Sequence, residues 1–384
     1  TSSYSVTGVQ TCALPICAQR GNPQAKLVVS GCYASLETEA IAAELGVDLV
    51  VTNPDKDRLI DIAVRHLDLA VMPETATEPG EHALLARGRH RAFVKVQDGC
   101  RYRCAFCIVT KARGDERSQS VAAVVDEVNR AHASGIQEVV LAGVHLGGYG
   151  SDIGCDLTTL IEAVLSQTAV PRVRLGSLEP WELTDAFWSL FDDPRLMPHL
   201  HLPLQSGADS VLRRMSRRCR SADFRELVRQ ARQAIPGFGI TTDISVGFPG
   251  ETDAEWQQTV AFARAMPFSH IHVFAYSPRA GTRAAGMPDQ LSHNVKRMRS
   301  RQMHALAQAG RRQILSRAVG QIFEVLIEGR SGGDAGWSGY TPNYLRVEIE
   351  GDTLADLDNR IIRVRATALS RSEERRVGKE CRSR

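Results

Sequence analysis

Short apolar runs alternate with longer stretches of helical periodicity between residues 91 and 318. The runs are rich in Val, Ile and Leu and too short for helices, which is typical of strands buried in a parallel sheet. They read AFVKV, EVVLAG, RVRLGS, HLHLPL, ITTDISVG and HIHVFAY. Between them, stretches such as SVAAVVDEVNRAHASG repeat apolar residues at helical spacing. Six successive β-then-α units predict an α/β fold whose parallel sheet curls into a partial (β/α)6 barrel.

The regions on either side of this barrel have different patterns. Residues 18–70 contain two strand-then-helix units, which predict an N-terminal α/β domain. Two such units cannot close a core well, so we expect this domain to be truncated. The polar segment 71–90, which bears Pro and Gly, is a predicted linker. Residues 319–370 carry short alternating strands between Gly-rich turns, which predict a small C-terminal β-barrel.

The two ends of the chain differ from the rest. Residues 1–17 and 371–384 have no periodicity that joins them to their neighbours, and they resemble translated sequencing-adapter fragments. We expect a non-native leader and a non-native tail, and we infer nothing from either. The tail holds six Lys/Arg against three Asp/Glu, a surplus equal to the formal net charge of +3, so the remainder is neutral. Only local clusters of charge can therefore indicate nucleic-acid binding.

The composition is that of a globular protein from a reducing compartment. Hydrophobic residues make up 43% and charged residues 24% of the chain, which excludes a disordered class. No apolar run approaches the roughly 18–20 residues of a membrane span, and no secretory leader is recognisable. We therefore expect a cytoplasmic protein with no membrane partner. Nine cysteines, an odd number, argue against a disulfide framework and favour metal or redox chemistry for clustered thiols.

Three cysteines follow the first predicted barrel strand, at Cys100, Cys104 and Cys107. A cubane [4Fe–4S] cluster has four irons that need ligands, so three thiolates leave one iron open to a substrate or cofactor. A structural zinc site would need a fourth ligand to complete its tetrahedron. His132 and His145 are candidates for it, although neither has the spacing of a zinc finger. Zinc binding and buried free thiols remain the alternatives.

The spacing C-x3-C-x2-C after the first strand of a partial barrel resembles the radical SAM enzymes, and Phe106 fits the same pattern. The resemblance implies that Cys100, Cys104 and Cys107 bind a [4Fe–4S] cluster. Its open iron would be chelated by the amino and carboxylate groups of S-adenosylmethionine (SAM). Electron transfer into the sulfonium would then break a C–S bond and release a 5′-deoxyadenosyl radical. The cofactors carry this chemistry, while the protein orients them and excludes water.

Further segments resemble the methylthiotransferases along roughly residues 18–369. They are VKVQDGCRYRCAFCIVTKARG, LAGVHLGGYG, LGSLEP, HLPLQSGADSVLRRM, TTDISVGFPGET and HVFAYSPRAGT. Those enzymes combine an N-terminal α/β domain, a radical SAM barrel and a C-terminal TRAM domain of β-strands. AGVHLGGYG and GSLEP most resemble the branch that acts on N6-threonylcarbamoyladenosine beside the tRNA anticodon. The alternatives are the branches that act on isopentenylated adenosine or a ribosomal-protein aspartate, and a non-catalytic metal- or RNA-binding protein.

The resemblance implies a transferase that adds a 2-methylthio group to this adenosine. The adenosyl radical would abstract hydrogen from adenine C2, and a methylated sulfur would be inserted there. A second SAM would supply the methyl group. The implied partners are tRNA and a flavodoxin- or ferredoxin-type electron donor.

The same resemblance implies contacts to SAM at the ends of the barrel strands. Gly143 would meet the cofactor's amino group, Ser177 and Glu179 the methionine moiety, and Gln205 and Ser206 the ribose. Bottom-up, these are polar or glycine residues at the carboxyl ends of predicted strands, where a barrel places its chemistry. The alternative is that such residues only form turns.

Two other stretches concern the substrate side. The resemblance places GFPGET, residues 247–252, near the adenine of SAM, although Glu251 and Thr252 could merely start a helix. The family usually has Pro and an aromatic residue where Thr110 and Lys111 stand, and Arg where Gln119 stands. We expect these departures to alter the wall near the substrate without affecting cluster assembly.

Methylthiotransferases carry an auxiliary [4Fe–4S] cluster on three N-terminal cysteines, through which sulfur is delivered. Cys32, in SGCYAS, resembles the third of them and ends a predicted strand. Only Cys12 and Cys17 could stand for the second, and they lie in or beside the suspect leader. We therefore expect the chain as given to load the SAM cluster and to cleave SAM, but not to methylthiolate tRNA.

A basic stripe and three aromatic residues are candidates for contacts with RNA. Residues 296–317 hold seven basic residues and no Asp or Glu: Lys296, Arg297, Arg299, Arg301, Arg311, Arg312 and Arg317. Such a stripe on a long helix can follow a phosphate backbone, or it can simply be a solvated face. Trp337, Tyr340 and Tyr344 in the C-terminal region could stack on bases. The other cysteines, Cys155, Cys219 and Cys381, have no partner at ligand spacing and are predicted to be free thiols.

Overall fold

The computed structural model describes residues 26–45, 47–67, 90–330, 336–350 and 356–369. The predicted leader and tail, and all of the predicted linker except residue 90, lie outside these residues, as do Cys12, Cys17 and Cys381. The described chain forms two compact units. The first contains the residues up to 67 together with 99–102 and 107–115, and the second contains 90–98, 103–106 and 116–369.

The first unit is built around a two-stranded parallel sheet. β1 and β2 pair in register through Val29 and Val50, and the buried side chains of Ala34, Ile41 and Val51 form its core. Its elements are β1 (Val28–Ser30), α2 (Cys32–Leu36), α3 (Thr38–Leu45), β2 (Leu49–Val51), η1 (Asn53–Arg58), α4 (Leu59–His66) and α6 (Val109–Arg113). The strand-then-helix order predicted for this region is therefore confirmed in the described residues.

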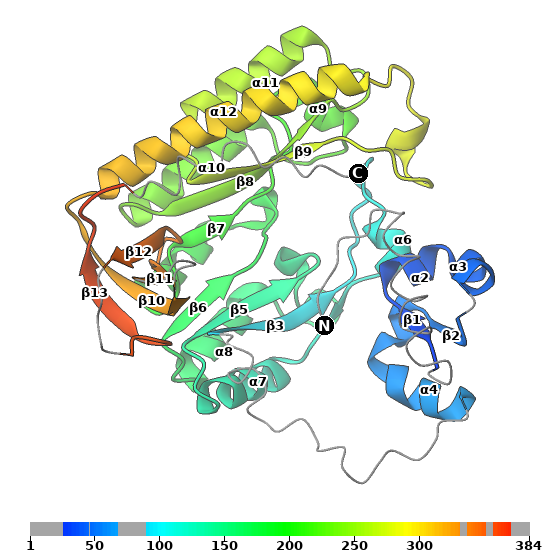
Figure 1. The fold of residues 1–384 in the computed structure, drawn as a ribbon, viewed down its shortest axis with the longest axis horizontal. Helices are drawn as coiled ribbons and strands as arrows, with labels where there is room; N and C mark the ends of the chain where they lie inside the picture. The colour runs from blue at the N-terminus through cyan, green and yellow to red at the C-terminus, as the bar shows by residue number, and fades with distance from the viewer. Residues whose placement is uncertain (1–25, 46, 68–89, 331–335, 351–355, 370–384) are drawn as a thin grey trace. The chain divides into compact units, whose positions relative to one another are not determined.

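The second unit contains the curled sheet predicted from the apolar runs. Its strands are β3 (Arg91–Asp98), β4 (Arg117–Ser118), β5 (Glu138–Gly143), β6 (Arg172–Leu175), β7 (His199–His201), β8 (Gly239–Val246) and β9 (His270–Ala275). β3, β5 and β6 pair in parallel, with the short β4 antiparallel at the edge, and β7, β8 and β9 form a second parallel group. Single bridges at Val173–Leu196 and Ser177–His201 join the two groups. Figure 1 shows the resulting arc, with helices on its convex side.

The helices of this unit begin where the sequence offers a cap. Ser120, Asp156 and Thr252 each accept a hydrogen bond from the backbone N–H three residues on, which satisfies a donor that the first turn leaves free. The helices are α7 (Val121–Ala133), α8 (Leu157–Gln167), α9 (Asp209–Arg214), α10 (Ser221–Ala234), α11 (Asp253–Ala265) and α12 (His293–Ala318). Four short 3-10 helices lie between them in the described residues: η2 (Leu146–Gly148), η3 (Pro180–Glu182), η4 (Asp185–Asp192) and η5 (Arg283–Gly286).

The two faces of the curled sheet differ in chemistry because strand side chains alternate. On β8, Ile240 and Ile244 are fully buried and belong to the main hydrophobic core, which also contains side chains of α10 and α11. Thr241 and Asp243 lie on the opposite face, which we call the inner face. A partial barrel leaves this face open, and Phe93 of β3 and Phe274 of β9 are exposed.

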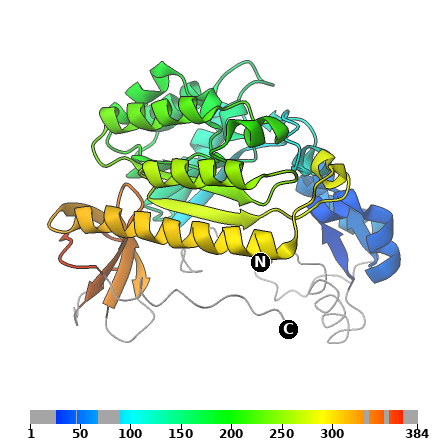
Figure 2. The ribbon, with the colours of Figure 1, turned by 90° about the horizontal axis from the view of Figure 1, so that it is seen from above.

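Four antiparallel strands follow α12 in the order β12-β11-β10-β13. They are β10 (Ile322–Arg330), β11 (Gly336–Tyr340), β12 (Arg346–Glu350) and β13 (Ile361–Arg365). Val325, Ile327 and Trp337 form their small core. The predicted β-barrel is therefore an open four-stranded sheet in the part of the chain that the structure describes. Figure 2 shows α12 running along the unit to this sheet.

The C-terminal sheet is bonded to the amino ends of the barrel strands. Arg172 donates to the carbonyl oxygens of Tyr340 and Glu324, at 3.1 and 2.8 Å. The ring of Tyr344 stacks on Tyr340, with centroids 4.8 Å apart, and also lies 4.8 Å from the ring of His199. We therefore expect the active site at the other end of the barrel, where the carboxyl ends of the strands lie. We call that end the mouth.

The prediction that Trp337, Tyr340 and Tyr344 are available for stacking on bases is wrong for this structure. Trp337 is buried in the core of the C-terminal sheet. Tyr340 and Tyr344 stack on each other, and the guanidinium of Arg91 lies over both rings. All three rings are already packed within the protein. Among the described helices, none is both long enough and apolar enough to cross a membrane.

Candidate active site

Cys104 is fixed in the second unit by the burial of its neighbour. The backbone N–H of Ala105 donates to Met215 at 2.9 Å, and its carbonyl accepts from Ala284 at 2.8 Å. The Ala105 methyl is buried in a small apolar cluster that includes Phe248, against which Phe106 also packs. Small and aromatic side chains around the cysteine therefore anchor the loop, as the motif predicts for its Phe.

A buried cation lies beside the Cys104 sulfur. Nη1 of Arg217 is 3.8 Å from this sulfur, and the same guanidinium makes two hydrogen bonds to the carboxylate of Glu179, at 3.1 and 2.6 Å. It also lies over the ring of Trp181, 4.5 Å from the centroid. Burial alone would lower the pKa of Arg217, but the charges of Glu179 and Cys104 outweigh it and raise the pKa. The guanidinium therefore places a positive charge beside the Cys104 sulfur.

Cys100 and Cys107 belong to the first unit, where both are half-buried. The N–H of Cys100 donates to the carbonyl of Gly114 at 3.2 Å. Gly99 has a φ of 74°, and a Cβ there would overlap the carbonyl oxygen of Asp115, so only glycine fits before this cysteine. Cys32 lies in the same unit, as the first residue of α2 rather than the end of a strand, and α2 packs on α6.

Two of the residues predicted to contact SAM, Gly143 and Ser177, lie where neighbouring segments of the chain come close together. Gly143 ends β5, and a Cβ there would lie 2.9 Å from Oε1 of Gln97, so a side chain is excluded. Ser177 forms a parallel bridge with His201 where the two groups of strands meet. The third, Glu179, is held by Arg217 beside Cys104. The structure therefore brings Glu179 and Cys104 together through one arginine.

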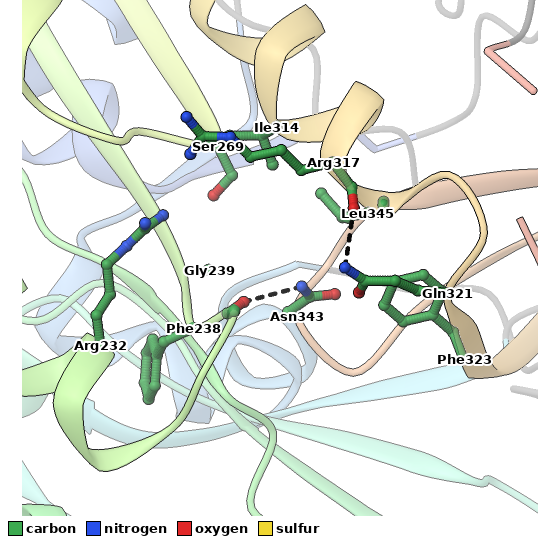
Figure 3. Close-up of a pocket in the computed structure, with 12 residues that line it drawn as sticks. Arg232, Phe238, Gly239, Ser269, Ile314, Arg317, Gln321, Phe323, Asn343 and Leu345 are labelled. Atoms are coloured by element: carbon green, nitrogen blue, oxygen red, sulfur yellow. Dashed lines mark hydrogen bonds between the residues drawn. The ribbon is translucent and has the colours of Figure 1, made fainter.

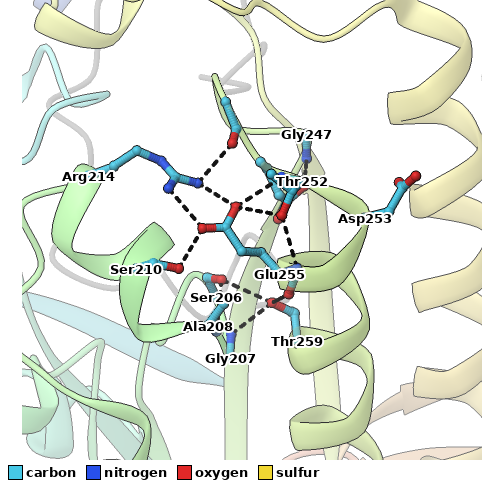
Figure 4. Close-up of polar contacts among 12 residues, drawn as sticks. Ser206, Gly207, Ala208, Ser210, Arg214, Gly247, Thr252, Asp253, Glu255 and Thr259 are labelled. Carbon is cyan, nitrogen blue, oxygen red and sulfur yellow. Dashed lines mark hydrogen bonds and ion pairs between the residues drawn. The ribbon is translucent and has the colours of Figure 1, made fainter.

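Gln205 and Ser206 are placed differently from each other. Gln205 has a φ of 79°, which is uncommon for a residue with a side chain, and its N–H and C=O bond to Asp243 and Ser245 of β8. Ser206 is fully buried, and its hydroxyl bonds to Oγ1 of Thr259 at 3.0 Å, as Figure 4 shows. The Ser206 hydroxyl is therefore engaged with α11, inside the fold.

The segment 247–252 is held by its own contacts. Glu251 is buried and accepts from the N–H of Gly247 at 2.8 Å and from Arg299 at 2.7 Å, and burial raises its pKa. Thr252 caps α11 and shares a capping box with Glu255, so the alternative of a helix start is correct for Thr252. Arg299 is only 3% exposed, so its place in the predicted RNA-binding stripe is wrong.

Glu255 also ties α9 to α11. Its carboxylate accepts from both terminal nitrogens of Arg214, each at 2.8 Å, and from the hydroxyl of Ser210 at 2.5 Å (Figure 4). Hydrogen bonds from Arg214, ahead of those from Ser210 and Thr252, lower the pKa of Glu255 to about 2. This network fixes the helices that follow β7 and β8.

A buried ion-pair cluster lies at the mouth, which the sequence did not reveal as a group. Nδ1 of His145 bonds to Glu116, and Nε2 bonds to Glu182 at 2.7 Å. Burial would lower the pKa of His145, but Glu182 and then Glu116 outweigh it and raise the pKa. We call these three residues the mouth cluster. Because both ring nitrogens bind carboxylates, His145 is not available as a zinc ligand.

A second cluster lies on the inner face of the sheet. His201, Asp243 and His272 come from β7, β8 and β9, and Nε2 of His201 is 3.3 Å from Oδ1 of Asp243. Burial, followed by the charge of His201, lowers the pKa of His272. We call these residues the inner-face cluster. Sequence reasoning missed it, although the spacing H-x-H within HLHLPL and HIHVFAY indicates paired imidazoles on one face of each strand.

The basic residues of α12 divide between surface and interior. Arg297, Arg301 and Arg312 are exposed, and helical spacing puts them on one face. Arg311 is half-buried. Lys296 is also half-buried, with its amino group 5.0 Å from the centroid of the Tyr276 ring, and burial lowers its pKa. Arg317 is exposed as well, so the exposed part of the predicted stripe contains four of its seven residues.

A cavity of about 230 Å³ lies where α10, the end of α12 and the C-terminal sheet meet. Figure 3 shows Arg232 and Arg317 among its lining residues, and none of the described residues that line it is Asp or Glu. Burial and the charge of Arg317 lower the pKa of Arg232. Its lining residues include Gly239, at the amino end of β8, so the cavity is remote from the mouth and suited to an anion rather than to the SAM chemistry.

Comparisons with known proteins agree with the site. Residues 94–263 match the model of the Radical SAM superfamily. The chain is 33% identical over 371 residues to the threonylcarbamoyladenosine tRNA methylthiotransferase MtaB of Bacillus subtilis, covering 91% of this chain and 80% of that protein. The MtaB of Thermotoga maritima is 34% identical, with the same coverage of both chains. A ribosomal protein uS12 methylthiotransferase, RimO of Desulfotalea psychrophila, is 35% identical over 80% of this chain and 72% of its own.

A solved structure shows the same fold. The radical SAM methyltransferase TsrM of Kitasatospora setae, solved with cobalamin and a [4Fe–4S] cluster, superposes with a TM-score of 0.55 at 18% identity, covering 68% of this chain and 59% of its own. At this identity the likeness supports the partial barrel alone. The similarity along nine tenths of the sequence, the cysteine motif and the barrel agree, and the chain belongs to the radical SAM methylthiotransferase family of SAM-dependent transferases.

Proposed function

We propose that this protein is a tRNA methylthiotransferase that adds a 2-methylthio group to N6-threonylcarbamoyladenosine. The observation that carries the proposal is the similarity to MtaB proteins over about nine tenths of the chain. The segment AGVHLGGYG supports this branch by its resemblance, and its His145 forms the centre of the mouth cluster. Gly147 and Gly148 lie against Glu182 and His145 so closely that a Cβ would clash.

The donors present fit an iron–sulfur cluster and SAM. Cys100, Cys104 and Cys107 are half-buried cysteines, and cysteine thiolates are the ligands that such clusters prefer. When bound, the cluster and SAM supply reductive cleavage and a carbon-centred radical. In the second unit, Arg217 would stabilise negative charge at the Cys104 sulfur. Its buried Nε has no hydrogen-bond partner among the described residues.

The remaining roles follow from the same proposal. Gly143, Ser177, Glu179 and the backbone of Gln205 would line the SAM site, whereas the Ser206 side chain would support it from within the fold. Cys32 would be one ligand of a second [4Fe–4S] cluster, with its partners outside the described residues. The C-terminal sheet would act as a TRAM domain.

The partners are proposed on the same basis. The exposed arginines of α12 and the cations of the cavity in Figure 3 would contact tRNA phosphates. Electrons would come from a flavodoxin- or ferredoxin-type protein, in the cytoplasm where tRNA is modified. Binding of tRNA would weaken with rising salt, because phosphate contacts release counterions.

The test is nucleoside analysis of tRNA from a strain that lacks its own enzyme and expresses this protein. We expect mass spectrometry to detect 2-methylthio-N6-threonylcarbamoyladenosine, and we expect a Cys104→Ala variant to abolish it.

A second candidate is the same chemistry on isopentenylated adenosine or on a ribosomal protein. It is favoured by a tRNA-2-methylthio-N(6)-dimethylallyladenosine synthase of Anaeromyxobacter dehalogenans and by the RimO relative, both 35% identical to this chain. Identity alone therefore does not separate the substrates. A methylthio group found only on dimethylallyladenosine would indicate the first of these substrates, and one found only on ribosomal protein uS12 would indicate the second.

A further inference from the structure

The inner-face cluster contains three potential metal ligands from three neighbouring strands. One donor atom each from His201, Asp243 and His272 lies within 4.8 Å of the other two. Asp243 and His272 are register partners of β8 and β9, and His201 pairs with Thr241, two positions before Asp243 on the same face. The rigid sheet, rather than a loop, therefore holds the donors together.

The closest pair already has the spacing that one metal ion requires. Two ligands that each lie about 2.1 Å from an ion at the tetrahedral angle are about 3.4 Å apart. Nε2 of His201 and Oδ1 of Asp243 are 3.3 Å apart. The His272 side chain is exposed and can close the remaining distance by a small rotation.

The ring of His201 is oriented in the way that metal-binding histidines are. Its Nδ1 lies 2.9 Å from Oγ1 of Thr241, which is also 3.2 Å from Nε2 of the buried His199. A proton on Nδ1 that is donated to Oγ1 leaves the lone pair of Nε2 directed toward Asp243. Such a hydrogen bond on the outer nitrogen fixes both the tautomer and the ring of a metal ligand.

The cluster also contains more imidazoles than carboxylates. Two imidazoles lie beside a single carboxylate, and His272 is exposed on the inner face. Two histidines and one carboxylate are a recurring ligand set for divalent first-row metals, with the remaining positions open. The thiolate site has a different chemistry, because its soft sulfur ligands select an iron–sulfur cluster.

We propose that His201, Asp243 and His272 bind a divalent first-row transition-metal ion, separate from the iron–sulfur clusters. Three protein ligands leave positions at which oxygen donors can coordinate from the open inner face. The site stands on its own geometry and does not depend on which nucleoside or protein is methylthiolated.

The test is a titration of the cluster-reconstituted protein with Mn²⁺, followed by electron paramagnetic resonance. The oxidised [4Fe–4S] cluster is diamagnetic, so the signal of free Mn²⁺ reports binding directly. We expect one equivalent to bind, and we expect Asp243→Asn and His272→Ala each to weaken binding at least about tenfold. His270→Ala is the control, because the His270 ring packs against His272, with centroids 4.5 Å apart, but is not one of the three donors. This variant should weaken binding much less than His272→Ala does.

A second measurement needs no variant. Mn²⁺ or Co²⁺ added to the wild-type protein should raise the unfolding temperature, since an ion that binds only the folded state stabilises it. The proposal is overturned if neither ion binds or shifts the unfolding temperature. It is also overturned if His270→Ala weakens binding as much as His272→Ala does.

Discussion

The mouth cluster and the inner-face cluster contain the same residue types but differ in their role. At the mouth, one imidazole lies between two carboxylates, and its side chain is only 1% exposed. On the inner face, two imidazoles lie beside one carboxylate, and His272 is exposed. In the first cluster both ring nitrogens are bonded to carboxylates, so no nitrogen is left for a ligand. In the second, the imidazoles outnumber the carboxylate, so a ring nitrogen can bind a ligand. The ratio of carboxylates to imidazoles and the degree of burial therefore separate a structural cluster from a binding site.

Removal of the mouth imidazole should have the largest effect. His145→Ala leaves Glu116 and Glu182 buried without their shared partner, which is expected to cost about 3–5 kcal/mol of unfolding free energy. Chemical denaturation measures it. His132→Ala is the control, since the His132 ring bonds to the carbonyl of Ile136 rather than to a carboxylate. Equal losses in both variants would contradict the structural role of the mouth cluster.

Neutralising one carboxylate at the mouth should have a smaller effect. Glu182→Gln keeps a hydrogen-bonding side chain near Nε2 of His145 but removes its charge, with an expected loss of about 1.5–3 kcal/mol. The same denaturation experiment measures it. A loss equal to that of His145→Ala would show that the second carboxylate, on Glu116, contributes nothing.

The two regions should also respond to pH in opposite directions. The pKa of His145 is raised, so its contribution to stability is fully present below its ordinary value of 6.5 and is lost as the pH rises through the higher folded value. Burial, ahead of the charge of His272, lowers the pKa of His270 on the inner face to about 4. Stability contributed there is present above 6.5 and is lost as the pH falls toward 4.

Unfolding free energies of the wild type, His145→Gln and His270→Asn across this range measure both effects. The advantage of the wild type over His145→Gln should shrink above pH 6.5. The advantage over His270→Asn should shrink below it. If the unfolding free energies of the two variants changed with pH in the same way, the predicted difference between the two regions would be wrong.

The inner-face variants should have the smallest effect on stability without metal. His201 and Asp243 are each about one fifth exposed, so solvent screens their attraction, and Asp243→Asn should cost less than about 1 kcal/mol. Denaturation in the presence of a chelator measures this. A loss as large as that at the mouth would mean that Asp243 is structural.

Local patterns predicted much of the fold. All six apolar runs of the barrel are strands in the structure, because a buried parallel strand needs a continuous apolar segment. The sequence also predicted that the cysteine motif follows the first barrel strand, which is β3. The mouth cluster could not be predicted, since Glu116 and Glu182 lie 29 and 37 residues from His145 and meet it only in the folded barrel. Arg299 and Trp337 were misjudged because charge and aromaticity do not reveal burial.

The central claim is that three thiolates hold a cluster that cleaves SAM, and one comparison tests it most directly. The wild type, Cys104→Ala and Cys155→Ala are reconstituted anaerobically, and iron content and 5′-deoxyadenosine are measured after reduction with SAM present. Cys155 is also a half-buried free thiol, so it serves as the matched control. We predict that wild type and Cys155→Ala form 5′-deoxyadenosine and that Cys104→Ala does not. Undiminished 5′-deoxyadenosine from Cys104→Ala, or a wild type that takes up no iron, would contradict the account.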